Sequence, residues 1–177
     1  MLGQMDDRER EAFFARPPPP GRSRESSIVL DERGRFWHDG ELVRHGPMHD
    51  AFSRWVDRHP KDGRFILNNG YDWSYISVAG APFQVLRVSR ETPRGVAWLE
   101  LSDGTCEPLD AAQCWFGREG VVWTRVKQGR FTARMTPAAQ LGLAEWLEEG
   151  DEGEIFLRVG QTRHRMTERP PDSEPGP

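Results

Sequence analysis

Cationic side chains gather on one face of a hairpin that the sequence predicts between residues 121 and 135. Gln128-Gly129 is a turn signal between two stretches rich in apolar residues. The cross-strand pairs predicted from this turn are Lys127 with Arg130, Arg125 with Thr132, and Trp123 with Arg134. Because cross-strand partners share a face, Arg125, Lys127 and Arg130 are candidates for binding a phosphate or another small anion. The alternative is a solvated basic face beside an acidic stretch at 145–154.

Aromatic side chains alternate along a second predicted strand. Tyr71, Trp73 and Tyr75 project to one face of residues 71–78, because successive side chains on a strand point to opposite faces. Asn69-Gly70 is expected to form a tight turn, with residues 64–68 as the partner strand. Trp73 and Tyr75 are therefore candidates for stacking on a flat ring of a ligand. The alternative is that a tail or a neighbouring domain covers this aromatic face.

Histidine spacing does not predict a metal site. His45 and His49 have the i, i+4 spacing of zinc ligands on a helix, and His38 is close to them in sequence. Pro47, however, is expected to be the first helical residue. His45 then precedes the helix, and the regular projection of the two side chains fails. We therefore expect no metal.

The motifs of common catalytic sites are also missing from the sequence. It contains no H-E-x-x-H, no G-x-S-x-G and no phosphate-binding P-loop. Cys106 and Cys114 are too few for a disulfide framework, and both are expected to be buried small residues. We expect no cofactor and no enzymatic activity. The alternative is a hydrolase whose site assembles from distant residues.

The composition excludes several broad classes of protein. Of 177 residues, 36% are hydrophobic and 29% are charged, and the formal net charge of −4 argues against general binding to a nucleic-acid backbone. No apolar run approaches the ~18 residues of a membrane helix. The first ten residues lack the hydrophobic region of a secretory signal. We expect a cytoplasmic protein that neither inserts into membranes nor binds polymeric nucleic acid.

Proline distribution separates the tails from the folded body. Eight of the 14 prolines lie near the ends of the chain, and runs of proline favour an extended backbone. The predicted organisation is a flexible tail with a proline run (1–25), an N-terminal α+β half (26–90), a C-terminal α+β half (91–167) and a disordered tail (168–177). Within the first tail, a short helix capped by Asp6 or Asp7 would let Phe13 and Phe14 dock on the body.

Periodicity predicts an α+β fold of antiparallel strands with one amphipathic helix in each half. The helices are expected to begin at Pro47 and Pro137, and the first should end near His59 because Pro60 follows it. The strands are expected at 28–30, 35–38, 64–68, 71–78, 82–89, 96–101, 106–109, 121–127, 130–135, 154–159 and 162–166, with a turn at 92–95.

Two stretches of the chain look alike and predict an internal duplication. Gly46–Gly70 and Thr136–Gly160 both contain a proline-started helix with one tryptophan, an acidic turn with glycine, and an apolar strand that ends at glycine. At a fixed offset of 90 residues, Pro47 aligns with Pro137 and Leu67 with Leu157. The alternative is that any helix–turn–strand unit has this pattern.

Part of the sequence resembles a bacterial family of unknown function, number 1285. The resemblance covers residues 27–89, where a strand and a turn precede the helix and two further strands follow it. The matching residues are Gly34, Phe36 or Trp37, His38, Gly40, Asp62, Gly63, Phe65, Ala81, Pro82 and Phe83. The chain departs from the family pattern at Gly80, where an acidic residue is common, and at residues 68–71.

The resemblance carries its own implications for fold and function. It implies a duplicated α+β core whose second half is superficially similar to a pleckstrin-homology domain. It also implies a site between the halves for a nucleotide-like molecule, and a role in signalling. His38 joins the candidate ligand-binding residues through the W-x-H-x-G-like turn that it shares with the family pattern.

Two functional hypotheses follow from these observations. The first is a non-enzymatic module that binds a small anionic or nucleotide-like ligand between its two halves. Its candidate residues are Trp73, Tyr75, Arg125, Lys127, Arg130 and His38. The second is a protein-interaction module that pairs through the edge of a sheet or presents its proline-rich tail to a partner.

Overall fold

The chain folds as two separate units. The computed structural model describes residues 6–91 and 96–168, so the predicted turn at 92–95 and residues 169–177 of the predicted second tail lie outside the described residues. The first unit contains residues up to 79, except for residues 32–34, which group with the second unit from Gly80 onward. The predicted boundary after residue 90 is displaced, because residues 83–91 pair within the second unit's sheet.

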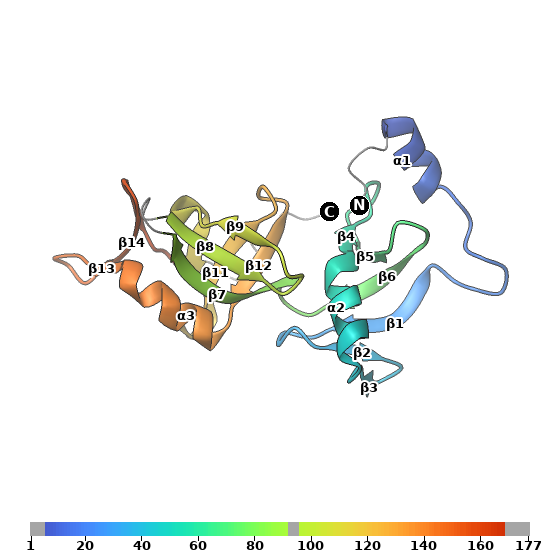
Figure 1. The fold of residues 1–177 in the computed structure, drawn as a ribbon, viewed down its shortest axis with the longest axis horizontal. Helices are drawn as coiled ribbons and strands as arrows, with labels where there is room; N and C mark the ends of the chain where they lie inside the picture. Colours follow the sequence, from blue (N-terminus) through green and yellow to red (C-terminus); the bar gives the residue numbers. More distant parts are fainter. Residues whose placement is uncertain (1–5, 92–95, 169–177) are drawn as a thin grey trace. The chain divides into compact units, whose positions relative to one another are not determined.

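A six-stranded sheet forms the centre of the first unit (Figure 1). Its strands are β1 (Glu25–Leu30), β2 (Phe36–His38), β3 (Glu41–Leu42), β4 (Val56–Arg58), β5 (Phe65–Asn68) and β6 (Trp73–Val78), in the order β3-β2-β1-β6-β5-β4. Neighbouring strands are antiparallel except for β1 and β6, which are parallel. The prediction of antiparallel strands alone is therefore wrong at this joint, where two three-stranded meanders meet.

The hairpin of β5 and β6 is wider than the sequence predicts. Asn68 pairs with Trp73 and Ile66 with Tyr75, so the connection contains four residues instead of the two-residue Asn69-Gly70 turn. The Asn69 side chain accepts hydrogen bonds from the backbone of Tyr71 and Asp72, which stabilises the longer turn. The register shifts by two residues, so the predicted faces are kept. Tyr71, however, leaves the sheet and is 90% exposed.

Residues 6–25 of the predicted first tail are not a free tail in this structure, and residues 1–5 lie outside the described residues. Helix α1 (Asp7–Phe14) has Asp6 as its N-cap, and the side chains and backbones of Asp6 and Glu9 form a capping box. Phe13 and Phe14 are buried against Ile66 and Trp73, which confirms the expected docking. The flexible tail was predicted from the proline run. Two apolar side chains ahead of that run bury enough area to hold α1 on the sheet.

Helix α2 (Gly46–Trp55) begins as predicted and ends earlier. His45 is its N-cap and accepts a hydrogen bond from Met48 N, so His45 precedes the helix. The helix stops at Trp55 because Val56 and the two residues after it form β4, in which Val56 pairs with Leu67. Backbone pairing with β5 therefore ends the helix before the Pro60 signal is reached.

A second six-stranded sheet forms the centre of the second unit. Its strands are β7 (Phe83–Glu91), β8 (Val96–Leu101), β9 (Cys106–Pro108), β10 (Cys114–Phe116), β11 (Val122–Val126) and β12 (Phe131–Met135), in the order β10-β11-β12-β7-β8-β9. Two short 3₁₀ helices, Ala111–Gln113 and Arg118–Gly120, flank β10. Val85, Leu99, Leu101 and Val126 are fully buried and form part of its core.

Helix α3 (Pro137–Leu143) packs on β7. It begins at Pro137, as predicted, with Thr136 as its N-cap, and Ala139 and Leu143 are its buried side chains. Leu141 of the same helix is 78% exposed. A 3₁₀ turn (Ala144–Trp146) then leads into a separate three-stranded sheet of β13 (Leu147–Glu149), β14 (Ile155–Val159) and β15 (Thr162–Arg165).

The two large sheets share one order of strands. In each, three consecutive strands form one antiparallel half, the next three form the other, and the first and sixth strands pair in parallel. The predicted repeat does not coincide with this order. Gly46–Gly70 covers α2, β4 and β5, whereas Thr136–Gly160 covers α3, β13 and β14, which follow the second sheet. The sequence pattern therefore reflects similar local helix–strand units.

The structure also corrects one of the two cysteine predictions. Cys114 is fully buried, and burial raises the pKa of its thiol to about 12. Cys106 is exposed, because it begins β9 at the edge of the second sheet. Neither cysteine is in a disulfide. In the part of the chain that the structure describes, no helix is long and apolar enough to cross a membrane.

Candidate functional site

The predicted basic hairpin forms with the register that the sequence indicates. In β11 and β12, Trp123 pairs with Arg134, Arg125 with Thr132, and Val126 with Phe131. Lys127 and Gln128 have positive φ angles of 54° and 59°, so the chain reverses through a left-handed turn before Gly129. Because the register is correct, Arg125, Lys127 and Arg130 lie at the same end of the hairpin.

These three cations line one hollow in the second unit. The hollow has a volume of ≈ 680 Å³, which is within the range of small-molecule sites. The residues around it are Glu107, Pro108, Asp110, Gln113, Arg125, Lys127, Gln128, Gly129 and Arg130. Three cationic and two acidic side chains therefore share its wall, and the basic side chains are in the majority.

Lys127 is already committed to neighbouring acidic groups. Its ammonium group pairs with Asp103 Oδ2 at 2.7 Å and donates to the Thr105 hydroxyl, while its backbone N–H donates to the Glu107 carboxylate at 3.0 Å. Burial alone would raise the pKa of Asp103, but the hydrogen bonds from Lys127 and Thr105 outweigh it and lower that pKa. Lys127 therefore holds the turn in place as well as contributing charge.

Arg125 is the cation best placed to meet a ligand. One of its guanidinium N–H groups donates to the Gly129 carbonyl at 3.3 Å, which holds the side chain along the turn. A guanidinium has five N–H donors, so this single bond leaves the planar fork suited to a phosphate or carboxylate. The Arg130 guanidinium lies 5.2 Å from the centre of the Phe131 ring.

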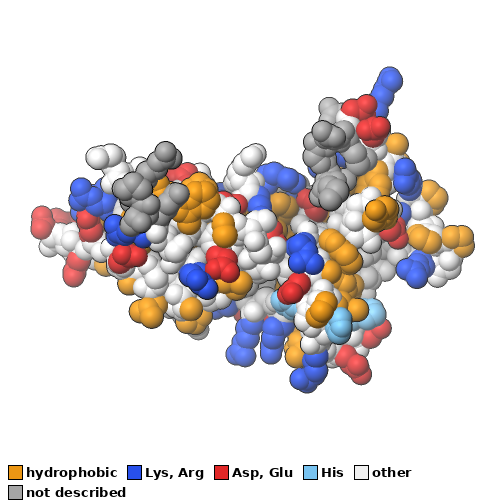
Figure 2. Space-filling model, in the orientation of Figure 1, with side chains coloured by type: hydrophobic (Ala, Val, Ile, Leu, Met, Phe, Trp, Pro, Cys, Tyr) orange, Lys and Arg blue, Asp and Glu red, His pale blue; other side chains and the backbone are white. Residues whose placement is uncertain are grey.

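The predicted acidic stretch is partly neutralised. Glu145 pairs with Arg90 at 3.1 Å, and Glu148 pairs with both Arg158 and Arg163 at 3.2 and 3.3 Å. Acidic side chains also gather over the turn between β13 and β14, at the left edge of Figure 2. The ion pairs offset part of the negative charge that the sequence concentrates in this stretch.

Trp73 is not an open stacking platform in this structure. Its side chain is 6% exposed, with the Phe14 ring centre 5.9 Å away and the Arg24 guanidinium 4.3 Å over its own ring. Arg24 also donates to the carbonyls of Arg16 and Pro17, so it connects the sheet to the chain that leaves α1. The alternative that a tail covers the aromatic face is what the structure shows.

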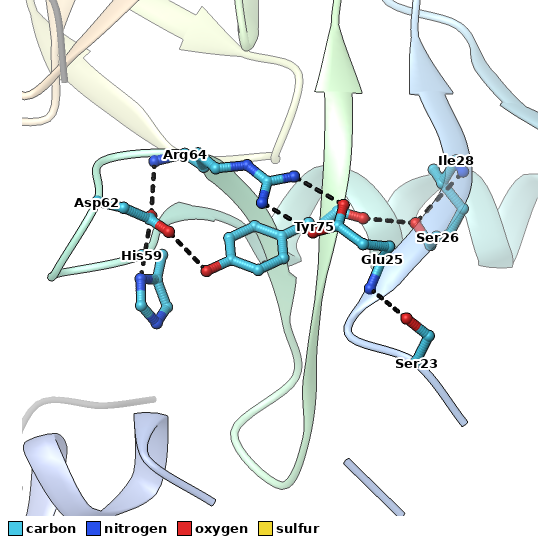
Figure 3. Close-up of polar contacts among 8 residues, drawn as sticks. All are labelled: Ser23, Glu25, Ser26, Ile28, His59, Asp62, Arg64 and Tyr75. Carbon is cyan, nitrogen blue, oxygen red and sulfur yellow. Dashed lines mark hydrogen bonds and ion pairs between the residues drawn. The ribbon is translucent and has the colours of Figure 1, made fainter. Parts of the chain in front are cut away.

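Tyr75 belongs to a polar network that the sequence did not predict (Figure 3). Its hydroxyl donates to Asp62 Oδ2 at 2.7 Å, and Asp62 Oδ1 lies 3.0 Å from His59 Nδ1. The Arg64 guanidinium lies 3.7 Å from the centre of the Tyr75 ring and binds both oxygens of Glu25 at 2.8 and 2.7 Å. Tyr75 is therefore held on both its hydroxyl and its ring.

The pairing of His59 with Asp62 has the geometry of a histidine oriented by a carboxylate. The His59 ring is buried among the rings of Phe14, Trp73 and Tyr75, at centre distances of 5.3, 4.8 and 5.5 Å. This burial gives the network a structural role beneath α1. The only sign of this network in the sequence is the short spacing of His59 and Asp62 on either side of Pro60. Of these residues, only Asp62 is among those that match the family pattern.

His38 and Trp73 line a second hollow, which lies in the first unit. Its volume is ≈ 460 Å³, and it also includes Phe52 and Trp55 of α2. The side chain of His38 is 58% exposed, with Nε2 at 3.6 Å from Asp39 Oδ2. Across the described residues, no group of three potential ligands could hold a metal ion. The six predicted residues therefore divide among the basic hollow, this second hollow and the Tyr75 network.

Comparison with solved structures shows the same fold in two other proteins. A DUF1285 family protein from Silicibacter pomeroyi DSS-3 superposes with a TM-score of 0.65 and 18% identity, over 85% of this chain and 83% of that one. A DUF1285 family protein from Shewanella baltica OS155 gives a TM-score of 0.54 and 14% identity, over 70% of this chain and 94% of that one. No family model and no curated protein matches the chain. The resemblance to family 1285 is thus confirmed as a likeness of fold.

Proposed function

We propose that this protein is a non-enzymatic module that binds a small anionic ligand in the basic hollow of its second unit. The observation that carries the proposal is the convergence of Arg125, Lys127 and Arg130 on one hollow of ≈ 680 Å³. The sequence-based hypothesis placed the ligand between the halves, whereas the proposed site is built within one unit. Two arginine forks and one ammonium group favour an anion over a neutral molecule.

The acidic side chains of the hollow narrow the class of ligand. Glu107 and Asp110 lie on the same wall as the cations, and a carboxylate can accept hydrogen bonds from hydroxyl or amino groups. A ligand that carries both an anionic group and hydroxyl or amino donors matches this mixture. A nucleotide-like molecule has both, with its phosphate directed to Arg125 and Arg130.

The broader assignments belong to the same proposal. The shared strand order of the two sheets supports a duplicated origin. The packing of α3 on the second sheet supports a likeness to pleckstrin-homology domains. A cytoplasmic role in signalling fits a module that binds a small anion without transforming it. These assignments are the ones that the resemblance to family 1285 implies.

Calorimetric titration with inorganic phosphate and with adenosine monophosphate tests the site. We expect saturable binding that weakens by roughly tenfold or more in Arg125→Ala, because a charge-assisted hydrogen bond is lost. Arg87→Ala is the matched control, since Arg87 is exposed and pairs with Glu100 away from the hollow's lining. Glu107→Gln should tighten the binding of inorganic phosphate by removing a negative charge from the wall. Absence of binding, or equal loss in Arg125→Ala and Arg87→Ala, contradicts the proposal.

A protein-interaction role is the second candidate. Pro17, Pro19 and Pro20 are exposed, while Arg24 fixes the start of the run through the Pro17 carbonyl. An anchored, exposed proline run can present its rings to an aromatic groove of a partner. Loss of a co-purifying protein in Pro19→Ala/Pro20→Ala, with α1 intact, would support this role. An unchanged set of co-purifying proteins would count against it.

A further inference from the structure

An irregularity in the first sheet lies beside the hollow that His38 and Trp73 line, because Ser26, Ser27 and Ile28 also line it. Glu25 pairs with Tyr75 and Val29 with Ser77, so β1 advances four residues while β6 advances two. The extra residues bulge away from β6, and the backbone pairing is interrupted between Glu25 and Val29. Ser26 Oγ donates to the Tyr75 carbonyl and accepts from Ile28 N, which holds the bulge in one conformation (Figure 3).

The wall of this hollow combines aromatic rings with small polar groups. Phe52 and Trp55 come from α2, with ring centres 5.9 Å apart, and Trp73 comes from β6. Four small polar residues, Ser26, Ser27, Asn69 and Ser74, line the same hollow. The volume of ≈ 460 Å³ is in the range of small-molecule sites, and flat rings lined by a few polar groups are typical of such sites.

The two carboxylates on the wall of this hollow, Glu25 and Asp72, are paired with arginines, and Arg22, on the same wall, helps to lower the pKa of Asp72. Both oxygens of Glu25 are bound by Arg64, at 2.8 and 2.7 Å. Asp72 forms an ion pair with Arg24, and these contacts, with the backbone of Trp73, outweigh burial and lower the pKa of Asp72. Because both carboxylates are paired, they do not favour the binding of a cationic ligand. This differs from the basic hollow of the second unit.

The polar groups of the wall favour a ligand that accepts hydrogen bonds. The Asn69 carbonyl oxygen already accepts from the backbone of Tyr71 and Asp72, so its NH₂ end is the part suited to a ligand. The Trp73 indole N–H is buried and, within residues 6–91 and 96–168, has no hydrogen-bond partner. This N–H has less than 1 Å² of exposed area, so the Asn69 amide is the donor offered to a ligand, and the Trp73 N–H reports on changes at the ring that lines the hollow.

We propose that this hollow is a second ligand site, independent of the anion site, which binds an uncharged, flat heteroaromatic ring that carries a hydrogen-bond acceptor. The ring lies against Phe52 and Trp55, and its acceptor faces the Asn69 amide. Aromatic rings that are fixed before binding lose little conformational entropy when a ligand stacks on them. Phe52 is fixed in this way by the rings of Phe36 and Trp55, whose centres lie 5.3 and 5.9 Å from its own.

Nicotinamide is the probe for this site, with two matched compounds as controls. The indole N–H resonances of ¹⁵N-labelled protein are followed by NMR, and the Trp73 signal is assigned with Trp73→Phe. We expect nicotinamide to shift the Trp73 signal in a saturable manner. Cyclohexanecarboxamide has the same amide on a saturated ring, and nicotinate has the same ring with a negative charge. Both are expected to bind more weakly.

Two variants localise the binding. Trp55→Ala should weaken nicotinamide binding by roughly tenfold, as expected for the loss of a stacking ring. Trp37→Ala is the control in the same unit, because Trp37 bonds Asp31 and does not line the hollow. Arg125→Ala should leave the titration unchanged, which separates this site from the anion site. No saturable shift, equal binding of the saturated amide, or an unchanged affinity in Trp55→Ala would each overturn the inference.

Discussion

At the scale of single residues, burial and hydrogen bonding move the pKa values of Asp62 and Tyr75 in opposite directions. Burial by itself would raise the pKa of Asp62, but hydrogen bonds from the Tyr75 hydroxyl, the Arg64 backbone and His59 lower it. Burial, together with the nearby Asp62 carboxylate, raises the pKa of Tyr75 to about 12. The shared hydrogen bond therefore favours an ionised Asp62 and a neutral Tyr75.

A Tyr71→Phe variant isolates the titration of Tyr75, because the sequence contains two tyrosines. We expect its phenolate absorbance to appear with a midpoint near 12. The folded pKa is raised above the unfolded value of 10.0, so this group's contribution to stability is complete below pH 10 and is lost as pH rises through 12. Circular dichroism checks that the fold persists. A midpoint near 10 in folded protein would contradict the assigned environment of Tyr75.

At the scale of elements, one glycine sets how closely α3 approaches β7. A Cβ atom at Gly142 would lie 2.7 Å from the Val88 carbonyl oxygen, which belongs to the backbone of β7 and cannot rotate away. Helix propensity alone would favour alanine at this position by about 1 kcal/mol. Glycine at this position therefore allows close packing of α3 on β7, although glycine is a poorer helix former than alanine.

Gly142→Ala is expected to lower the free energy of unfolding by roughly 1–3 kcal/mol, as overpacking does. Gly46→Ala is the matched control, because a Cβ at Gly46 in α2 meets nothing within 4 Å. The control should be neutral or slightly stabilising. Urea denaturation of both variants measures the difference. Equal stability of the two variants would show that α3 has room to move on β7.

The docking of α1 depends on two phenylalanines. Phe13 and Phe14 are 3% and 8% exposed, and their rings meet edge to face with centres 5.1 Å apart. The capping box stabilises the start of this eight-residue helix, but a helix of this length is marginal by itself. Its persistence therefore requires the contact with Ile66 and Trp73.

Phe14→Ala is expected to release α1 from the sheet, because truncation of a buried phenylalanine costs about 3 kcal/mol or more. The released helix should fray and become a substrate for trypsin after Arg8 and Arg10. Glu11→Ala is the control, since Glu11 is exposed on the same helix. Cleavage rates are compared by mass spectrometry under native conditions. If Phe14→Ala and Glu11→Ala are cleaved at the same rate, α1 is not held by this contact.

At the scale of the whole molecule, each unit has a core of its own. Ile66 is fully buried in the first unit and Leu99 in the second, and each six-stranded sheet closes its pairings within its own unit. Truncation of a core side chain should therefore destabilise mainly the unit that contains it. Such locality is the expected behaviour of units with separate cores.

Ile66→Ala and Leu99→Ala form a reciprocal pair for this prediction. Each should cost about 2–5 kcal/mol in its own unit through lost burial and the cavity left behind. Hydrogen exchange resolved by mass spectrometry should show faster exchange in residues 35–79 for Ile66→Ala and in residues 96–168 for Leu99→Ala. Equal loss of protection in both regions for either variant would show that the units unfold together.

Local signals in the sequence predicted most of the elements and one part of the candidate site. The β11–β12 register follows from a turn and two alternating strands, so Arg125, Lys127 and Arg130 could be grouped without a structure. Pro47 and Thr136-Pro137 likewise predicted where α2 and α3 begin. These features depend on neighbours within a few residues, whose preferences act through local backbone geometry.

Long-range pairing decided what these local signals leave open. The parallel contacts of β1 with β6 and of β12 with β7 place the unit boundary near residue 80, and the bulge in β1 lines the second hollow. The burial of Trp73 beneath α1 and the Arg64–Glu25 ion pair join residues far apart in sequence. The sequence by itself thus determined the helix starts and the register and basic turn of the β11–β12 hairpin. Only the tertiary structure decided which faces were covered, because burial depends on segments that meet through the fold.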